Sequence, residues 1–420
     1  MALVAERQAP ADRTGDRLSV LIINDFADVT GGTARVALAE AAGLARRGHR
    51  VTLVAGHGEP DPEVLGAGVT VHTTNQPTTW GDSQRVRAAA RGIWNPVSAR
   101  LVGELASSTE RPAVVHVHGF TKVVSASVVR AAVRSGLPVL ATLHDYFAAC
   151  PNGAFYIYPR GEACMLRPLS ARCIATDCDA RAYSHKVWRV GRSAVQRSLG
   201  AMPGRVGDLI APSRHAAEIL RPYLPSTARV HILANPVQVP HMPPAEESID
   251  PTYVFVGRLQ REKGPLLLAR AARAARVPAT FVGEGDEAAA IRSTYPEAKL
   301  TGWLTPAAVQ AAIRGARAVV TPSLGYEVQP LVPLEAAAQG VPSIVSDRLG
   351  ERDAIDDGVS GLWFRAGDVD DLAEKLSNLW HDADLARQLG RAAYERFWSE
   401  PRDLATHLDE LERIYRGALA

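Results

Sequence analysis

The stretch "LSVLIINDFADVTGGTARVALAEAAGLARRGHRVTLVAG", Leu18–Gly56, contains the pattern that decides the predicted fold. A short apolar run at Leu18–Asp25 is followed by a helical pattern at Ala34–Gly48 and by a second apolar run at His49–Gly56. Apolar runs of this length are typical of buried strands. Strands that alternate with helices form parallel sheets with helices on both faces. The stretch therefore predicts an α/β protein with a doubly wound sheet.

The alternation continues along the chain and is interrupted once. Residues 236–252 carry five prolines and no apolar period, which is typical of a linker. Further strands are predicted before this linker at Val69–Thr74, Ala113–Gly119, Pro138–Asp145, Asp208–Ser213 and Arg229–Pro236, and after it at Tyr253–Leu259, Ala279–Gly285, Lys299–Trp303, Ala318–Ser323 and Pro342–Asp347. Two Rossmann-like domains follow from this pattern, one at 17–238 and one at 239–399. Such domains bind ligands in a cleft at the carboxyl ends of their strands.

The composition describes an ordinary globular protein and excludes several classes. Hydrophobic residues make up 46% of the chain and charged residues 22%, and the formal net charge is +2. This charge gives no large field of one sign, so we expect no nucleic-acid partner. No uncharged stretch approaches the length that spans a bilayer. Residues 1–16 lack the apolar segment of a secretory signal, so we predict a disordered leader and a cytoplasmic protein.

The segment "GYEVQPLVPLEAAAQG", Gly325–Gly340, predicts a loop followed by a helix. Proline is tolerated in the first turn of a helix, where its missing N–H would have no helical partner. Pro333 therefore fits the start of the helix, and Leu334–Ala338 are good helix formers. Gly340 is typical of the residue that ends a helix.

Two glutamates flank the start of this predicted helix. Glu327 lies in the loop and Glu335 lies one turn into the helix. The N–H groups near Leu331 and Val332 form a site for an anion, and carboxylates accept hydrogen bonds from sugar hydroxyls. A ligand with both phosphate and hydroxyl groups, such as a nucleotide sugar, would use both features. The alternative is that the glutamates only complement the helix dipole.

A second motif places two cations after the first strand of the second domain. "VGRLQREKG", Val256–Gly264, carries Arg258 and Lys263 between a strand and a helix. A diphosphate binds at such turns, because arginine offers a planar fork and lysine a compact charge. The alternative is an ordinary solvated basic turn.

The motifs taken together resemble the retaining family 4 glycosyltransferases of the GT-B fold. The resemblance covers roughly residues 18 to 415, and the fixed order of the motifs makes it far more specific than any single motif. The matching segments are "TGGTARVALAEAAGLARRGHRVTLV" (Thr30–Val54), "GRLQREKG" (Gly257–Gly264), "VGEGD" (Val282–Asp286), "LTGW" (Leu300–Trp303), "EAAAQGVPSIVSD" (Glu335–Asp347) and "DGVSG" (Asp357–Gly361). An NAD-dependent dehydrogenase is not expected, because Gly-x-Gly-x-x-Gly is missing after the first strand.

The resemblance implies a donor site in the second domain. Arg258 and Lys263 would hold the donor diphosphate, Glu327 would contact the transferred sugar, and Glu335 would contact the ribose. The base would lie against the turn around Trp303. The implied donor-binding residues are Arg258, Lys263, Trp303, Leu304, Glu327, Leu331, Val332 and Glu335.

The resemblance makes the first domain the acceptor-binding domain. Gly31 and Gly32 would let its backbone approach the donor and the acceptor closely. His144 would act near the reacting sugar, together with Arg258, Lys263 and Glu327 of the second domain. His118 would line the same loop as Gly31 and Gly32. The final helix, within 400–420, would pack back on the first domain.

The implied reaction is sugar transfer from a nucleoside-diphosphate sugar to an acceptor hydroxyl with retention of the anomeric configuration. The acceptor is a small molecule, a glycan or a lipid-linked compound. The favoured mechanism is a front-face substitution in which fixed cations stabilise the leaving diphosphate, so no catalytic metal or other cofactor is expected. The chain reads Glu327-Val328-Gln329-Pro330 where the family often has Glu-Gly-Phe-Gly, and it has Asp353 where glutamate is more usual. A non-catalytic binding partner and a nucleotide-sugar epimerase remain as alternatives.

All four cysteines lie within 29 residues, at Cys150, Cys164, Cys173 and Cys178. A stable disulfide is disfavoured in a reducing cytosol, so a structural four-thiolate zinc site is one interpretation. Buried free thiols and disulfides formed on purification are the alternatives, because the spacing contains no Cys-x-x-Cys.

Two further patterns have both an ordinary and a functional interpretation. His116 and His118 alternate along a strand and so share one face, either near the acceptor or as core histidines. The basic segment Arg85–Leu101 is either a peripheral membrane contact or a solvated helix, and Pro96, which breaks its apolar stripe, favours the solvated helix.

Overall fold

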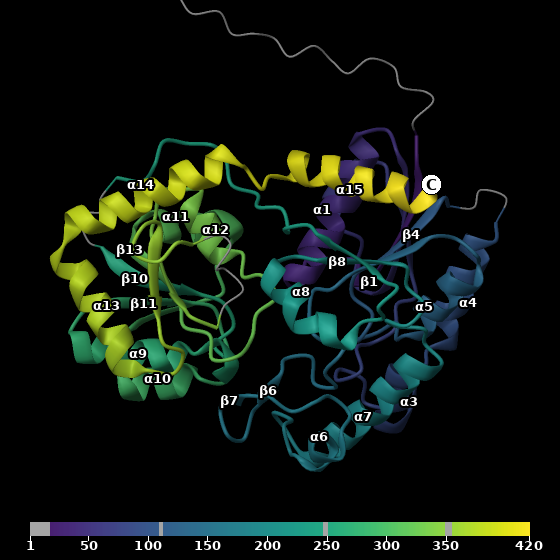
Figure 1. The fold of residues 1–420 in the computed structure, drawn as a ribbon, viewed down its shortest axis with the longest axis horizontal. Coiled ribbons are helices and arrows are strands. Elements are labelled where there is room, and N and C mark those ends of the chain that lie inside the picture. The colour runs from purple at the N-terminus through teal and green to yellow at the C-terminus, as the bar shows by residue number, and fades with distance from the viewer. Residues whose placement is uncertain (1–16, 109–111, 247–250, 349–354) are drawn as a thin grey trace, which may run out of the picture. The chain divides into compact units, whose positions relative to one another are not determined.

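The computed structural model describes residues 17–108, 112–246, 251–348 and 355–420 (Figure 1). The leader predicted at 1–16 and the predicted departure at Asp353 lie outside the described residues. The chain divides into two compact units, one that takes in the chain up to Leu140 together with Tyr415–Ala420, and one at Ala141–Ile414. Within the described ranges, we find no helix with the length and apolar character to cross a bilayer.

A seven-stranded sheet forms from the strands predicted before the linker. Its order is β3 (Thr70–Thr73), β2 (Arg50–His57), β1 (Ser19–Phe26), β4 (Val114–Val117), β5 (Val139–Thr142), β8 (Asp208–Ala211) and β9 (Arg229–Ile232). β1 pairs in parallel with both β2 and β4. Val20, Leu21, Ile22 and Ile23 of β1 are at most 1% exposed. A strand buried on both faces needs such an unbroken apolar run, which is why Leu18–Gly56 predicts this fold.

The helices of this part of the chain follow the strands. They are α1 (Gly32–Arg46), α2 (Pro62–Gly66), α3 (Arg85–Ile93), α4 (Pro96–Ala106), α5 (Ser127–Arg134), α6 (Ala171–Ala175), α7 (Tyr183–Ser198) and α8 (Arg214–Leu220), with a 3₁₀ turn at Arg221–Tyr223. α1 begins directly after Gly31 and ends at Arg46, within one or two residues of the predicted helix.

A six-stranded sheet forms from the strands predicted after the linker. Its order is β12 (Lys299–Gly302), β11 (Ala279–Val282), β10 (Thr252–Val256), β13 (Ala316–Thr321), β14 (Ser343–Ser346) and β15 (Gly361–Phe364). β10 pairs in parallel with β11 and β13. The buried core beneath β10 contains Tyr253, whose hydroxyl donates to the carbonyl of Leu376 at 2.6 Å. The buried hydroxyl of Tyr253 therefore has a hydrogen-bond partner within the core.

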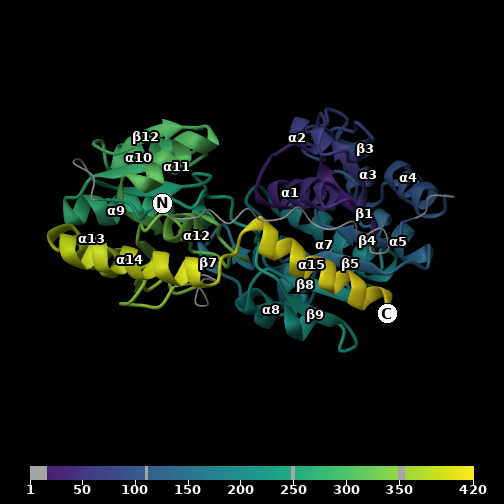
Figure 2. The same ribbon diagram turned by 90° about the horizontal axis from the view of Figure 1, so that it is seen from above.

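The second set of helices surrounds and follows this sheet. They are α9 (Pro265–Ala275), α10 (Ala288–Thr294), α11 (Pro306–Arg314), α12 (Val332–Ala337), α13 (Val369–His381), α14 (Ala383–Ser399) and α15 (Leu404–Leu419), with a 3₁₀ turn η2 at Arg261–Lys263. α13 and α14 are consecutive and in contact, and both views show them in yellow (Figures 1 and 2).

The final helix, α15, packs through apolar side chains, as the resemblance implies. Leu408, Leu411 and Tyr415 are at most 2% exposed. The hydroxyl of Tyr415 lies 2.8 Å from Nδ1 of His116, which belongs to β4. Because Tyr415 is part of the same compact unit as β4, the end of α15 packs on the first sheet, as expected.

The predicted linker has no regular secondary structure over 233–246. The strand β15 and a short hairpin, β6 (Tyr156–Ile157) and β7 (Glu162–Ala163), were not predicted. The hairpin strands are two residues long, which is too short for any periodicity to indicate them.

Candidate active site

The loop and helix predicted at Gly325–Gly340 form as expected. β13 ends at Thr321 and α12 begins at Val332, with Pro333 in its first turn. Gly340 follows the helix with φ of +77°, a left-handed conformation that glycine adopts without strain. Glu327 therefore lies in the loop and Glu335 in the first turn of the helix.

Glu327 is the centre of a polar cluster. Its Oε2 lies 2.6 Å from Nζ of Lys263, and its Oε1 accepts a hydrogen bond from the hydroxyl of Ser323. The Glu327 side chain is 13% exposed and the Lys263 side chain 28% exposed. A carboxylate and an ammonium group thus stand side by side in a partly open position, where a ligand could reach both.

The position of Lys263 follows from a tight turn between β10 and α9. Lys263 ends the 3₁₀ turn η2, and Gly264 has φ of +68° before α9 begins at Pro265. The carbonyl of Glu262 accepts from the N–H groups of Leu324 and Gly325 at 2.9 and 3.2 Å. These bonds fasten the turn to the loop after β13. The cation and the carboxylate are therefore held together by the main chain as well as by their own contact.

Replacing Gly264 by alanine tests this turn. A Cβ at this position would lie 2.0 Å from the carbonyl oxygen of Pro322, and the left-handed φ adds strain. We expect Gly264→Ala to lower the free energy of unfolding by about 3 kcal/mol or more, measured by urea denaturation. Gly68→Ala is the matched control, since Gly68 has φ of +87° but a Cβ there would meet no atom of a non-neighbouring residue within 4 Å. Its expected cost is about 1 kcal/mol, and equal losses for both variants would contradict the steric argument.

Arg258 stands on the solvent side of the same turn. Its side chain is 65% exposed, and its Nη2 lies 3.9 Å from Oε1 of Glu262. At this distance and exposure the ion pair contributes little stability. The Arg258 side chain is therefore available to an anionic ligand that binds near Lys263.

Glycines allow the main chain at the carboxyl ends of β10, β11 and β12 to approach closely. The N–H of Gly257 donates to Val282 O at 3.0 Å, and the N–H of Gly283 donates to Gly302 O at 2.9 Å. A Cβ on Gly283 would lie 2.0 Å from the carbonyl oxygen of Gly257, so only glycine fits there. Trp303 follows directly after Gly302 and is 76% exposed. An aromatic face is thus presented to solvent where a base is predicted to lie, with Leu304 half-buried beside it.

Two anchors of the Glu327 loop were not predicted from the sequence. The hydroxyl of Ser213 donates to Val328 O at 2.6 Å, and Oε1 of Gln329 accepts from the N–H of Asn235 at 2.7 Å. Gln329, one of the residues that depart from the family pattern, thus helps to hold the loop in place through its side chain. The partners lie 94 or more positions away in the sequence, so no local pattern indicates them.

Tyr146 is a third unpredicted contact of the loop. Its hydroxyl donates to the main-chain carbonyl of Glu327 at 3.1 Å. Burial of the phenol raises the pKa of Tyr146 far above its usual value, so the hydroxyl stays protonated and remains a donor.

The other predicted donor residues occupy the first turn of α12. Leu331 precedes the helix and Val332 begins it. Glu335 is 5% exposed, and its N–H donates to Leu331 O at 2.8 Å. A buried carboxyl group in a first turn is stabilised by the helix dipole.

The predicted first-domain residues lie in different surroundings. A Cβ added at Gly31 or Gly32 would meet no atom of a non-neighbouring residue within 4 Å, so the backbone there borders open space. His144 is half-buried just after β5. His118 is 3% exposed, and its Nε2 lies 3.3 Å from Oε2 of Glu40.

His116 and His118 share one face of β4, as predicted. Their ring centroids are 4.1 Å apart, and both rings are buried. Each can offer a ligand atom within 4.8 Å of the other and of the Glu40 carboxylate. Because His116 also contacts the hydroxyl of Tyr415, this cluster connects α1, β4 and the end of α15.

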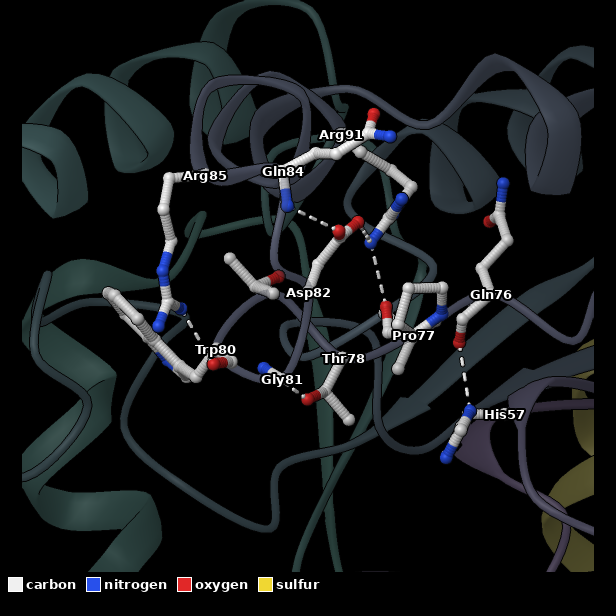
Figure 3. Close-up of polar contacts among 12 residues, drawn as sticks. His57, Gln76, Pro77, Thr78, Trp80, Gly81, Asp82, Gln84, Arg85 and Arg91 are labelled. Carbon is white, nitrogen blue, oxygen red and sulfur yellow. Dashed lines mark hydrogen bonds and ion pairs between the residues drawn. The ribbon is translucent and has the colours of Figure 1, made fainter.

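The basic segment predicted at Arg85–Leu101 forms α3 and most of α4, which are separated just before Pro96. Figure 3 shows the polar contacts of the loop before α3. Arg91 donates to the carboxylate of Asp82 at 2.9 Å, and Arg85 donates to Trp80 O at 2.8 Å. These two arginines therefore close the loop, and the solvated helix and the membrane contact both stay predictions.

Two family models match the chain. The model described as Glycosyltransferase Family 4 matches residues 30–239, which is half of the chain, and the model described as Glycosyl transferases group 1 matches residues 250–382. The chain belongs to glycosyltransferase family 4.

Individual relatives of this chain agree with the family assignment. It is 30% identical over 315 residues to D-inositol 3-phosphate glycosyltransferase from Frankia alni, an alignment that covers 67% of this chain and 70% of that one. It is 28% identical over 296 residues to glycogen synthase from Mycobacterium tuberculosis, and that alignment covers 64% of this chain and 66% of the synthase. The chain thus spans slightly less than two thirds of the synthase.

A solved structure shares the fold of this chain. The crystal structure of HepE from Anabaena in complex with UDP and glucose superposes with a TM-score of 0.66, at 15% sequence identity, over 96% of this chain and 100% of that one. With its two parallel sheets, the chain therefore has the predicted GT-B fold.

Proposed function

We propose that the protein transfers a sugar from a nucleoside-diphosphate sugar to an acceptor hydroxyl, with retention of the anomeric configuration. The observation that carries this proposal is the contact of 2.6 Å between Nζ of Lys263 and the carboxylate of Glu327. An ammonium group suits a diphosphate oxygen, and a carboxylate suits sugar hydroxyls. In a nucleotide sugar these two groups are joined through the anomeric carbon. An ammonium group beside a carboxylate would therefore contact both parts of such a donor.

The proposed reaction needs only groups that this arrangement supplies. The bond between the anomeric carbon and the diphosphate oxygen breaks, and the acceptor oxygen bonds to the same face of that carbon. The acceptor proton passes to the departing diphosphate oxygen. Lys263 and Arg258 would stabilise the charge that develops on this oxygen, which is the role that fixed cations fill in a transition state. Glu327 would orient the sugar, and His144 would stand near its reacting carbon.

The proposal covers the nucleotide as well. HepE, which shares the fold, was crystallised with UDP and glucose, and this supports a nucleoside diphosphate as the leaving group. Calorimetric titration with UDP, GDP, dTDP and ADP tests which base is preferred. We expect one of the four to bind with a Kd in the range of about 1–100 μM. If none of the four nucleotides binds, either alone or in the presence of candidate acceptors, the transferase proposal is wrong.

The stereochemical part of the proposal has its own measurement. Proton NMR of an early product distinguishes the two anomers, because their anomeric couplings differ. A product with the donor's configuration is expected. An inverted product would exclude the front-face mechanism while leaving the transfer itself intact.

The exposed Trp303 gives a prediction about the base. Stacking of a base on an aromatic side chain contributes about 1–3 kcal/mol. We expect Trp303→Ala to weaken nucleotide binding about tenfold or more in the same titration. Trp303→Phe keeps an aromatic face and should lose much less. Equal weakening in both variants would show that the ring does not stack on the base.

A further inference from the structure

The four cysteines of the chain line one small cavity. Cys150 follows β5, Cys164 follows β7, Cys173 lies in α6, and Cys178 precedes α7. The cavity between them has a volume of about 10 Å³, which is room for a single small ion or water molecule. Three of the thiols, at Cys150, Cys173 and Cys178, are at most 5% exposed. The fold therefore places four thiols from separate parts of the chain around one small cavity, with three of the cysteines buried.

A lysine lies among these thiols. Lys186 of α7 is 1% exposed, and its Nζ lies 3.1 Å from Sγ of Cys178 and 3.5 Å from Sγ of Cys173. A buried ammonium group is costly unless negative charge lies beside it. These two contacts hold the Lys186 ammonium group beside the sulfur atoms of Cys173 and Cys178, where thiolates formed on metal binding would offset its charge.

Asn152 connects the cluster further. Its Oδ1 accepts from the thiol of Cys150 at 3.0 Å, and its Nδ2 lies 3.4 Å from Sγ of Cys178. The Nδ2 contact has the direction of the outer hydrogen bonds that orient metal-binding thiolates, whereas the Oδ1 contact is made by a protonated Cys150 and would be lost when Cys150 binds a metal. The surrounding chain contains only the two-residue strands of the hairpin and the five-residue helix α6. A segment with so little regular structure gains stability from a cross-link at its centre.

We propose that Cys150, Cys164, Cys173 and Cys178 bind one structural zinc ion, with Lys186 donating to two of the thiolates. Binding releases the four thiol protons. The four thiolates and the divalent ion carry a net charge of −2, which Lys186 reduces to −1. Four thiolates also close the tetrahedral coordination of zinc, so the site is structural rather than catalytic. This inference is independent of the proposed sugar transfer.

Zinc binding requires the segment to contract. Among the described residues, no three of the Sγ atoms lie within 4.8 Å of one another. A tetrahedral site with Zn–S bonds of about 2.3 Å holds its sulfur atoms about 3.8 Å apart. The bound form is therefore tighter than the arrangement described here, and its loss should loosen the hairpin and α6. Limited proteolysis within 150–178 would detect this loosening.

Metal analysis of the full chain, purified without a histidine tag and without chelator, tests the site directly. We expect about one zinc per chain by mass spectrometry, and less than about a tenth of an equivalent in Cys173→Ser. Ile174→Ser is the matched control, because it places a serine next to Cys173 at a side chain that is 40% exposed. It should keep its zinc.

A thiol titration on the wild-type protein keeps the test valid if Cys173→Ser fails to fold. The chain has four cysteines in total, so every thiol counted belongs to this site. The native protein should show no reactive thiols until a strong chelator is added, after which four should react and zinc should be released. In Lys186→Met, zinc should remain bound but leave to the chelator about ten times faster or more.

Three results would overturn the zinc site. Under about a tenth of an equivalent of zinc in wild type, with four thiols that react only after denaturation, would show buried free thiols. Fewer than four thiols in denatured protein without reductant would show disulfides. Iron together with acid-labile sulfide would show a cluster rather than a zinc ion.

Discussion

Replacing Lys263 with methionine should abolish most of the sugar transfer. Methionine keeps the unbranched, apolar length of the side chain but removes the ammonium group that lies 2.6 Å from Glu327. A fixed cation at a developing anion is worth about 3–4 kcal/mol, so we expect kcat/KM to fall by about 10²–10³-fold. Binding of the preferred nucleoside diphosphate should weaken in the calorimetric titration as well, because its charge contact is lost. A Lys263→Met protein that binds the nucleotide like wild type would exclude Lys263 from the diphosphate site.

The chain offers a close control for this variant. Lys375 of α13 lies 3.9 Å from Asp371, and the exposed fractions of its side chain and its partner's are 29% and 13%. Those of Lys263 and Glu327 are 28% and 13%. Lys375→Met therefore removes a lysine of the same exposure from a similar ion pair, but outside the candidate site. Its activity should stay within about twofold of wild type, because exposed pairs contribute little.

Replacing Glu327 with glutamine should separate binding from transfer. Glutamine keeps the shape and one acceptor oxygen but loses the charge that orients sugar hydroxyls. We expect kcat to fall about 10²-fold or more. Binding of the bare nucleoside diphosphate should instead become several-fold tighter, because a like charge beside the phosphates is removed and Lys263 is released from its pair. Calorimetry and initial rates on the same preparation measure both effects.

Asp371→Asn is the control for Glu327→Gln, since it neutralises an acidic partner of lysine at the same exposure. It should change neither kcat nor nucleotide binding beyond about twofold. If Glu327→Gln weakened nucleotide binding as much as it lowered kcat, the variant would have disturbed the site as a whole. The assignment of Glu327 to the sugar would then fail.

The fold was predictable because its strands are simple in pattern. Buried parallel strands such as β1 and β10 must be apolar on both faces, so each appears as an unbroken apolar run between glycine- or proline-containing turns. The helix starting near Pro333 followed from stereochemistry alone. β15 was not predicted, although "DGVSG" directly before and into it was recognised as a motif. The strand is four residues long and two of its residues are only half-buried, so its pattern is weak.

The charged residues of the candidate site could be predicted from the sequence. The residues that hold them in place through hydrogen bonds could not. Lys263 and Glu327 carry the motifs, and the structure brings their side chains into contact. Ser323, Tyr146 and the pairing of Gln329 with Asn235 did not emerge from the sequence. A supporting contact depends on chain segments that meet only after folding, and neither partner needs a distinctive local pattern to make it.

The anchoring of the Glu327 loop has a consequence for protein engineering. The loop is held by hydrogen bonds from Ser213, which lies just after β8, and from Asn235, which lies before the proline-rich linker. A chimaera that joins the 239–399 segment of this protein to the first half of a relative would leave both supports behind. The Glu327 loop would then lose both supports, although every motif residue of the second domain was transferred. Exchanges that carry the segments around Ser213 and Asn235 together with the loop should preserve donor preference.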